Sequence, residues 1–550
     1  MMQQGQDTMH YCGMGCWNIR RCQPHNLDLG VTRHNTDGLK KRSTDKMAFF
    51  AYVLDSLASN PTASLVILLI LLMTWWYMKP SPYKFPPGRP CLPIFGNFSL
   101  FDLNADLPEM FLQISREYNS SAVVSWVFSF CTVIVNKYED ARELFMSDIF
   151  MNKIESSASK HVFRGIVGAQ GDRHKEQRRF TLSTLRDFGL GKNKVVEKIH
   201  EELEKLVEEL ENTNDLSIEM NCSSIFNTAV ANIICSMVFG HRFEYNDPTF
   251  KRMSSLNNEN ITTNIRRVYL KMAVPFADYI PGDLFREKRL QKCVDEVKQN
   301  VLIPEFRRHF ENYNPDHIGD YMDAFIKEMK DREGSDKEHW FTEEQLMWNI
   351  EDLFIAGTET TTTFLGWSFL MMLHYPDVQK RVQQEIHDIV GTDRLPSMTD
   401  KVNLPYTEAT LLEIQRRCPV VPLLGHCSIT PDKPSTFQEY ILPPNTNWVV
   451  NFHAVHHDPD YWQDPYTFNP ERFIGEDGKF KKDDHVMTFS VGKRSCLGES
   501  LAKAEMFLFF STVLQRFSLQ TEHNQPPPKI VKMPGLTSSP KPYKFCFVKL

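Results

Sequence analysis

The 550-residue sequence contains 12 cysteines but no Cys-x-x-Cys pair and no regular cysteine spacing. This pattern excludes a disulfide framework and is typical of reduced thiols in a protein that faces the cytosol. The sequence also lacks an excess of positive charge, since its 62 Lys and Arg residues are outnumbered by 69 Asp and Glu residues. The net charge of -7 gives no reason to expect a nucleic-acid partner, so any basic surface must be local.

No linker composition appears after about residue 100, so a division into several domains is not expected. Hydrophobic residues make up 42% of the chain and aromatic residues 12%, which is enough for a large core. Helical patterns dominate from Lys160 to about Arg417, whereas strands are predicted as a hairpin at 122–136 and as short segments at 439–442, 448–452 and near Phe545. We therefore expect one domain over residues 98–550, mainly α with a small β portion.

Residues 1–97 are predicted to form three segments of different composition. Residues 1–46 are polar and lack periodicity, which predicts a disordered extension. Residues 62–78 are almost wholly apolar and predict a transmembrane anchor at the short end of the spanning range. A secretory signal peptide is the alternative, but no small-residue cleavage site follows. Residues 79–97 are rich in proline and predict a hinge.

The orientation of this anchor depends on where translation begins. Lys79, Lys84 and Arg89 follow the apolar segment, so the positive-inside rule places the large domain in the cytosol if the chain starts at Met47. The basic residues before Met47 oppose this orientation. The sequence leaves open whether residues 1–46 belong to the mature protein.

One cysteine, Cys496, lies in a turn that opens directly onto a long apolar helical pattern. In the stretch Phe489–Gly498, Gly492 lets the backbone double back and Gly498 lets it approach a bulky flat group, because neither residue has a Cβ. Arg494 adds a fixed cation, and the N-terminus of the following helix favours a thiolate. A thiolate in such a turn is suited to a metal, whereas a buried structural cysteine is the alternative.

This stretch resembles the haem-ligand loop of the cytochrome P450 family. The signature positions of that loop are all matched, by Phe489, Gly492, Arg494, Cys496 and Gly498. The resemblance implies a haem b (iron protoporphyrin IX) with Cys496 on its iron, and a cysteine thiolate on haem iron favours cleavage of the O–O bond. It covers residues 47–550 and implies the cytochrome P450 fold with an N-terminal membrane anchor helix. The motifs Phe-Thr-Glu-Glu, Glu-Ile-Gln-Arg and Phe-Asn-Pro-Glu-Arg-Phe are similar to the microsomal family-2 type.

A second motif lies in a helix that is predicted to begin at Thr342, with a capping box, and to end before Pro376. In its middle, residues 356–363 contain a glycine and five threonines, which are poor helix formers and whose hydroxyls bend a helix locally. This segment resembles the oxygen-activation motif of the family. The resemblance implies that Ala356 contacts the haem, that Thr360 holds the oxygen and that Glu359 supplies protons. A kinked core helix without chemistry is the alternative.

A charged triad is expected to support the haem side of the core. Glu413 and Arg416 are spaced i to i+3, so their side chains meet on one helix face. Alone, such a pair is usually a surface salt bridge of little energy. The resemblance adds Arg472 and implies a buried triad, so we assign these three residues structural roles that decide haem retention rather than turnover.

Haem propionates require cations, and candidates that match the family by position are Arg494, Arg178 and His426. His174 stands where the family usually has tryptophan, and a histidine N–H is able to replace the indole. Three further histidines are predicted to be solvated in a loop rather than to bind a metal: His453, His456 and His457.

The predicted substrate pocket is apolar, so the substrate should be lipophilic. By resemblance, its lining residues are Phe163, Val167, Phe354, Val421, Leu423, Leu536 and Thr537. Basic residues are expected to crowd the face near the cysteine loop, which suits an acidic electron donor steered by charge. These residues are Lys175, Arg179, Lys479, Lys481, Lys482 and Lys493.

By resemblance, we identify the chain as a haem-thiolate monooxygenase of the endoplasmic reticulum membrane, with its catalytic domain on the cytosolic face. It is expected to insert one atom of dioxygen into a fatty acid, a steroid or a xenobiotic. No flavin or nicotinamide module remains in the chain, so electrons should come from NADPH through NADPH-cytochrome P450 reductase, with cytochrome b5 as a further partner.

Two alternatives stay open. The first is a haem-thiolate isomerase that rearranges peroxides without external electrons, and the intact Glu359–Thr360 pair argues against it. The second is a membrane-bound protein that binds haem and a lipophile without turnover, for which the departure at His174 is the hint.

Overall fold

The computed structural model describes residues 61–78, 81–92, 95–97, 102, 105–128, 130–148, 152–153, 164–189, 193–212, 217–221, 224–262, 267, 271, 274, 277–334, 339–429, 432–523, 525–533 and 535–550. They form two compact units, which divide between Lys79 and Pro80. The predicted extension at 1–46 lies outside the described residues, as does part of the predicted hinge.

The described part of the first unit is one helix, α2 (Pro61–Met78). Its apolar side chains from Leu65 to Leu72 are exposed. Among the described residues, we find no helix with both the length and the apolar character needed to cross a membrane.

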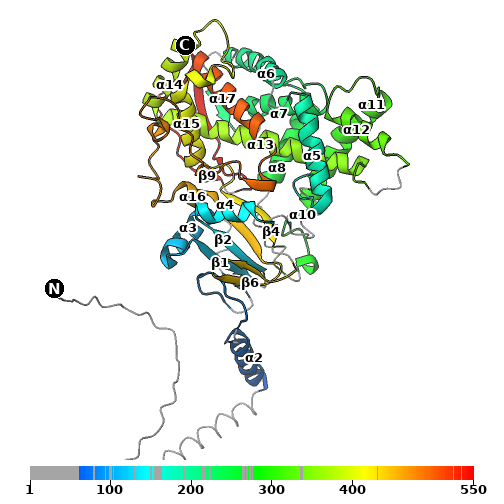
Figure 1. Ribbon diagram of the computed structural model, residues 1–550, viewed down its shortest axis with the longest axis vertical. Helices are drawn as coiled ribbons and strands as arrows, with labels where there is room; N and C mark the ends of the chain where they lie inside the picture. The colour runs from blue at the N-terminus through cyan, green and yellow to red at the C-terminus, as the bar shows by residue number, and fades with distance from the viewer. Residues whose placement is uncertain are drawn as a thin grey trace, which may run out of the picture. The chain divides into compact units, whose positions relative to one another are not determined.

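The second unit is mainly helical with a small β portion, as predicted. Its helices are α3 (Leu107–Tyr118), α4 (Tyr138–Met146), α5 (Gly171–Asp187), α6 (Asn193–Glu211), α7 (Ile225–Val238), α8 (Pro248–Thr262), α10 (Glu287–Val297), η5 (Lys298–Leu302), α11 (Ile303–Glu311), α12 (Tyr321–Asp331), α13 (Glu343–His374), α14 (Pro376–Ile389), α15 (Pro405–Arg417), α16 (Phe452–His456) and α17 (Glu499–Arg516). Within this unit, most helices surround α13 and the largest sheet lies at one end (Figure 1).

The largest sheet has the strand order β1-β2-β7-β4. The predicted hairpin forms from β1 (Ala122–Val127) and β2 (Phe130–Val135), whose alternating Val and Ile side chains suit a pleated, buried surface. Strand β7 (Asn447–Asn451) pairs with β2 in parallel, and β4 (Leu423–Ile429) pairs with β7 antiparallel. This sheet therefore joins residues that are more than 300 positions apart in the chain.

Shorter strands form three further sheets among the described residues, with the orders β3-β11-β8, β5-β6 and β10-β9. Their bounds are β3 (Ser217–Met220), β5 (Ser435–Phe437), β6 (Tyr440–Leu442), β8 (Phe517–Gln520), β9 (Lys532–Met533), β10 (Ser539–Pro540) and β11 (Tyr543–Lys549). The strands predicted at 439–442, 448–452 and near Phe545 are confirmed as β6, β7 and β11.

Helix α13 forms the centre of the core, and both of its predicted ends are confirmed. The Thr342 hydroxyl accepts a hydrogen bond from the Gln345 amide at 3.1 Å, which caps the helix N-terminus. The helix ends at His374, Tyr375 caps it, and Pro376 begins the next helix, α14. Helices α7 and α17 pack against α13, and 23 of its 32 residues are buried. A helix buried to this extent is held by its neighbours.

The prediction that three histidines are solvated is wrong, because His453, His456 and His457 are buried in and just after α16. The Met487 amide donates to His456 Nε2 at 3.0 Å, and His453 Nε2 lies 2.9 Å from Glu109 Oε2. Burial lowers the pKa of His456 to about 3, so the ring is neutral. These histidines connect segments of the core.

Candidate functional site

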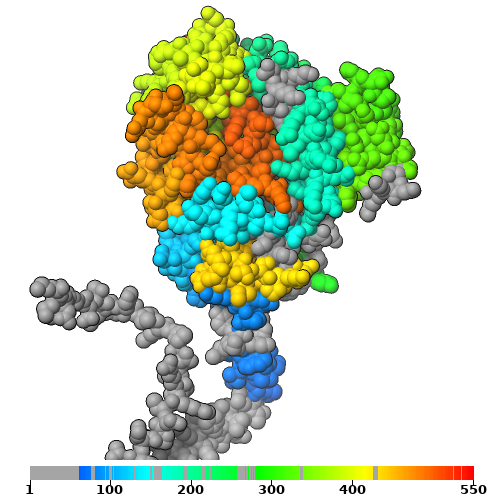
Figure 2. Space-filling model, in the orientation of Figure 1, coloured from blue at the N-terminus to red at the C-terminus, as the bar shows by residue number. Residues whose placement is uncertain are grey.

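A cavity of about 350 Å³ lies inside the second unit, within the size range of small-molecule sites. Its wall combines side chains of α5, α7, α13, α17, the largest sheet and the cysteine loop. Figure 2 shows the outer face of this region, where α4 (cyan), α5 (teal) and α17 (orange-red) lie next to one another. Much of the wall is apolar, including Ile166, Val167, Ile234, Phe364 and Val421.

The cysteine loop reaches the cavity through a tight turn, η8 (Gly492–Arg494). Gly492 has a φ of +80°, and a Cβ on it would lie 2.1 Å from the Phe145 carbonyl oxygen, so only glycine fits. The Cys496 amide donates to the Phe489 carbonyl at 2.9 Å, which closes the turn. A Cβ on Gly498 would meet no atom within 4 Å, so this wall residue leaves room for a flat group.

The Cys496 side chain is packed inside the unit but exposed to the cavity. Burial raises the pKa of this thiol, although the Gly498 amide and the Arg178 charge partly oppose the rise. A metal ion binds the thiolate form and displaces the proton. The single thiol on the cavity wall is therefore poised to become a metal ligand.

Four nitrogen-bearing side chains form what we call the cationic wall of the cavity: Lys153, His174, Arg178 and Arg494. Arg178 donates to the Ser495 carbonyl at 2.8 Å and Arg494 donates to the Ala169 carbonyl at 2.7 Å, which fixes both guanidinium groups. Burial and the charge of Arg178 lower the pKa of Arg494 to about 10. A bound anion with two carboxylates would relieve this crowding of positive charge.

His174 is buried in the cationic wall, and its Nδ1 has no hydrogen-bond partner among the described residues. Burial and the neighbouring charges of Arg494, Arg178 and Lys153 lower its pKa to about 3. The ring is therefore neutral and offers one N–H donor to an acceptor in the cavity.

The threonine-rich segment of α13, residues 356–363, contributes Ala356, Thr360 and Thr361 to the wall. The Thr360 hydroxyl donates to the Ala356 carbonyl at 2.7 Å, a back-bond of the kind that loosens a helix. The remaining lone pairs of Thr360 Oγ1 are then able to accept a hydrogen bond from a donor in the cavity.

Glu359 does not line the cavity, although its neighbours in the helix do. Its carboxylate oxygen Oε1 accepts hydrogen bonds from Thr363 at 3.2 Å and from Thr537 at 3.1 Å. Burial raises the pKa of Glu359 to about 7, despite these two donors. The carboxyl is therefore able to hold or release a proton near neutral pH.

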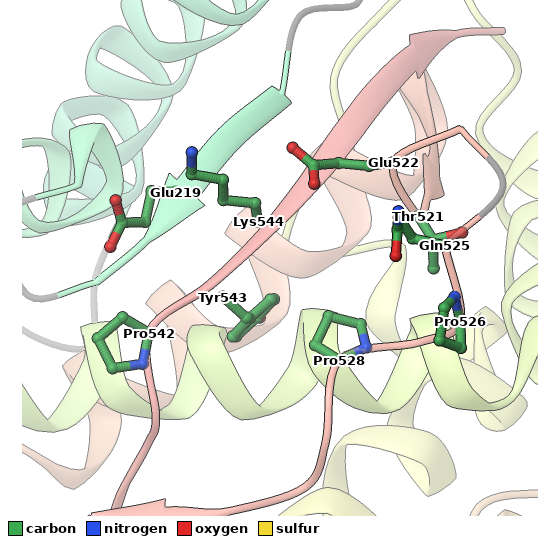
Figure 3. Close-up of a pocket in the computed structure, with 9 residues that line it drawn as sticks. All are labelled: Glu219, Thr521, Glu522, Gln525, Pro526, Pro528, Pro542, Tyr543 and Lys544. Atoms are coloured by element: carbon green, nitrogen blue, oxygen red, sulfur yellow. The ribbon is translucent and has the colours of Figure 1, made fainter.

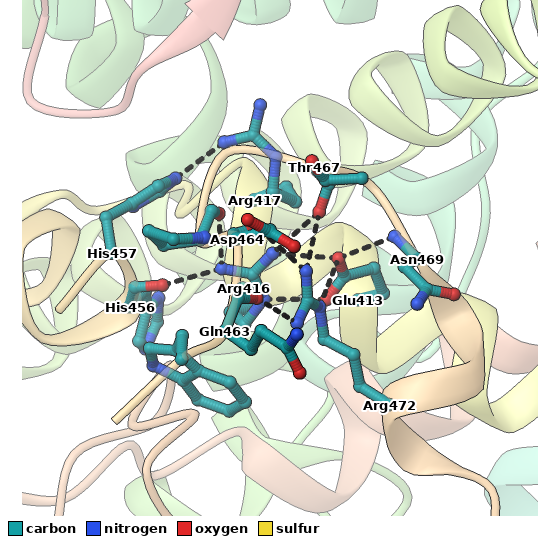
Figure 4. Close-up of polar contacts among 12 residues, drawn as sticks. Glu413, Arg416, Arg417, His456, His457, Gln463, Asp464, Thr467, Asn469 and Arg472 are labelled. Carbon is teal, nitrogen blue, oxygen red and sulfur yellow. Dashed lines mark hydrogen bonds and ion pairs between the residues drawn. The ribbon is translucent and has the colours of Figure 1, made fainter. Parts of the chain in front are cut away.

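The predicted triad forms near the C-terminal end of α15, next to η7 (Pro470–Phe473), and its Glu413 and Arg416 side chains are fully buried (Figure 4). Arg416 donates to both oxygens of Glu413 at 2.7 and 2.8 Å, and Arg472 Nε lies 3.4 Å from Glu413 Oε1. Arg416 also donates to the carbonyls of His456 and Pro465 at 2.7 Å. The triad thus ties α15 to the end of α16 and to the segment between α16 and η7.

Several predicted pocket residues lie elsewhere. Phe354 is in the core, with its ring 6.5 Å from that of Phe250, and Leu423 begins β4 and packs against a cluster between α3 and the largest sheet. Neither Leu536 nor Thr537 lines the cavity, and Thr537 bonds Glu359 instead. Phe163 and the side chain of His426 lie outside the described residues.

The cavity also contains polar residues that sequence reasoning missed: Lys153, Asp352 and Glu505. Asp352 Oδ2 accepts from the Val167 amide at 2.8 Å, and Glu505 Oε2 accepts from the Thr361 hydroxyl at 2.9 Å. A lone carboxylate inside an apolar helical pattern was an available signal for Glu505, whereas Asp352 stands next to Glu351. Lys153 lies outside any motif, so the sequence offered no comparable signal.

Another hollow, of about 400 Å³, lies between β3, β11 and the segment 521–528 (Figure 3). Its lining is mostly prolines and charged or amide side chains, such as Glu219, Glu522 and Lys544. It presents neither a thiol nor a cluster of basic residues. The inner cavity is therefore the better candidate for chemistry.

Comparison with known proteins finds similarity over most of the chain. A sequence model of the family described as Cytochrome P450 matches residues 86–547. The chain is 35% identical to human (Homo sapiens) Cytochrome P450 2J2 over 87% of this chain and 94% of that protein. It is 34% identical to rat (Rattus norvegicus) Cytochrome P450 2C23 over 88% and 97%, and 35% identical to rat Cytochrome P450 2B2 over 88% and 98%.

Proposed function

The chain belongs to the cytochrome P450 family and is a haem-thiolate monooxygenase, and we propose that it oxidises a lipophilic substrate with electrons from NADPH supplied through a separate reductase. The observation that carries the proposal is the shared cavity wall. It combines one thiol, a set of fixed cations, the Thr360 hydroxyl and an apolar surface. The apolar surface favours a fatty acid, a steroid or a xenobiotic over a charged metabolite.

The residues of the cavity fit a haem. Cys496 would supply the thiolate ligand, Gly498 would leave space beside it, and the cationic wall would provide donors for two propionates. When bound, a haem with a thiolate ligand supplies the activation of dioxygen. Arg178 and Arg494 would hold the group through its carboxylates, because their hydrogen bonds to backbone carbonyls already fix both guanidinium groups.

The protein's own contribution to the chemistry is to exclude water and to manage protons. The apolar wall excludes bulk water, which strengthens the remaining polar interactions. Thr360 Oγ1 accepts a hydrogen bond from a donor on the cavity side, while its own hydroxyl donates to the Ala356 carbonyl. Glu359 holds the reserve proton, since its pKa lies near 7.

The electron donor is proposed to dock on the face near the cysteine loop. Ion pairs with aspartates offset part of the positive charge on this face: Lys175 with Asp172, Lys479 with Asp477, Lys482 with Asp484, and Lys493 with Asp148. Arg179 and Lys481 are exposed there as well. We therefore expect electron transfer from NADPH-cytochrome P450 reductase, or from cytochrome b5, to weaken only moderately as salt is raised.

Attachment to the endoplasmic reticulum membrane is part of the proposal. The exposed leucines and isoleucines of α2 favour lipid contact over water. In membrane fractionation, the full chain should sediment with membranes after carbonate treatment, and Leu68→Arg together with Leu72→Arg should release it. Equal release of the wild type and the double variant would contradict membrane attachment through α2.

The first test of the function is the carbon monoxide difference spectrum of the reduced protein. A strongly red-shifted Soret band that is absent in Cys496→Ser supports thiolate ligation, and an unshifted band contradicts it. Reductase-supplemented membranes then separate the alternatives. A monooxygenase forms product only with NADPH, an isomerase forms product without it, and a binding protein forms none.

A further inference from the structure

Glu359 is turned away from the cavity that it is expected to serve. Ala356, Thr360 and Thr361 reach the wall, whereas the Glu359 side chain is only 5% exposed and lies on another side of α13. Successive residues of a helix point about 100° apart, so this separation follows from the helix itself. A proton held on this carboxyl therefore reaches the cavity only from certain orientations of the Glu359 side chain.

Two hydroxyls set that orientation, and they come from different parts of the chain. Thr363 stands one turn further along α13, and Thr537 stands in the segment before β10. Both donate to the same oxygen, Oε1, so Oε2 is the oxygen that carries the proton when the carboxyl is neutral. Losing either donor frees the carboxyl to rotate.

The Thr537 hydroxyl is itself held in place by the backbone around it. The Ser538 amide donates to the Val420 carbonyl at 2.7 Å, and the Trp367 indole donates to the Ser538 carbonyl at 2.6 Å. Thr537 is 5% exposed and does not line the cavity. Its hydroxyl therefore acts on Glu359 and has no direct access to a substrate in the cavity.

We propose that Thr537 is a positioning residue for proton delivery, because its anchored hydroxyl holds the Glu359 carboxyl in the orientation from which the proton leaves. The inference rests on the monooxygenase function proposed above. A proton donor that samples many orientations transfers its proton more slowly. Slow delivery favours the competing outcome, in which reduced dioxygen leaves as hydrogen peroxide.

The two outcomes have different balanced equations. Coupled turnover converts substrate RH, O2, NADPH and H+ into ROH, H2O and NADP+. Uncoupled turnover converts O2, NADPH and H+ into H2O2 and NADP+. The peroxide released per NADPH oxidised therefore measures how well protons are delivered.

The test compares Thr537→Val with Thr537→Ser in the full-length holoenzyme, supplied with reductase, NADPH and lauric acid as the probe. Thr537→Val keeps the shape of the side chain but removes its hydroxyl, so we expect about fivefold more peroxide per NADPH, the ratio associated with one ordinary hydrogen bond. Thr537→Ser should behave like the wild type. Ser538→Ala is the matched control, since the Ser538 backbone amide and carbonyl make the bonds to Val420 and Trp367.

Infrared spectroscopy provides a readout that does not require turnover. The stretching band of the protonated Glu359 carboxyl is assigned by its loss in Glu359→Gln. In Thr537→Val this band should move to higher wavenumber, because the carbonyl loses a donor, and in Thr537→Ser it should return. If the protein turns out not to be a monooxygenase, this band still tests the contact.

An unchanged band and unchanged peroxide release in Thr537→Val would overturn the proposal. So would a Thr537→Ser variant that resembles Thr537→Val, since that result assigns the effect to packing. If Thr537→Val does not bind haem, Thr537→Ala provides the same comparison with a smaller side chain. The dissociation constant of the probe should remain the same in all variants, because Thr537 lies outside the cavity wall.

Discussion

Replacing Arg416 with methionine should lower the free energy of unfolding by far more than the loss of one exposed ion pair would. Arg416 and Glu413 are fully buried, and the arginine makes two hydrogen bonds to the carboxylate and two to the carbonyls of His456 and Pro465. Arg416→Met keeps the length of the side chain but leaves the Glu413 charge in the core. Arg472, at 3.4 Å, is too distant to replace two short bonds.

The magnitude follows from this burial. Breaking one partner of a buried ion pair costs about 3–5 kcal/mol. Because about 1.4 kcal/mol is a factor of ten, the unfolding equilibrium should shift by roughly two to four orders of magnitude. That loss is a large part of a typical stability of about 5–15 kcal/mol.

The assay is urea unfolding of the detergent-solubilised full chain, followed by circular dichroism, together with haem content per protein. Arg394→Met is the matched control, because Arg394 also donates twice to a carboxylate, Asp400, at 2.6 Å, but is half exposed. This exposed pair should contribute at most about 1 kcal/mol. Equal losses in the two variants would refute the argument from burial.

Three further predictions follow. Gly492→Ala should abolish haem binding, because its Cβ would meet the Phe145 carbonyl at 2.1 Å; Gly478→Ala, which also has a positive φ but open space, should bind haem normally in the same spectrum. Glu505→Gln should flatten the pH dependence of the melting temperature. Burial raises the pKa of Glu505 from 4.5 to about 8, so the wild type loses stability as pH rises through this range, and parallel curves for both proteins would contradict the assignment. His174→Phe keeps the packing but removes the ring N–H. Haem should therefore transfer to apomyoglobin several-fold faster, which is about the factor expected from the loss of one hydrogen bond. An unchanged transfer rate would show that the ring does not contact the haem.

Local signals explain why the ends of α13 and the cysteine turn were predictable. Thr342 and Pro376 act on the backbone next to them, and the turn at Gly492 needs a φ of +80° that glycine favours. The hairpin at 122–136 is similar, because alternating side chains and a short connection decide its register. Such features need no knowledge of the rest of the chain.

Contacts between distant segments were not predictable in this way. Phe354 and Val421 are both apolar, yet only Val421 reaches the cavity, since the choice depends on which neighbours cover each residue. Thr537 was expected in the pocket but bonds Glu359, a partner 178 positions away. Lys153 enters the cationic wall from a segment without any recognisable pattern.

The parallel pairing of β2 with β7 has a consequence for the order in which the protein is made. Strand β2 leaves the ribosome early, but its neighbour β7 is synthesised more than 300 residues later. The cysteine, η8, α17 and Thr537 follow later still. During synthesis the β2 edge of the β1–β2 hairpin therefore stays unpaired until β7 emerges. A haem can bind Cys496 only when the chain is almost complete. Haem insertion is thus a late event, and the nascent chain depends on protection of the β2 edge until β7 emerges.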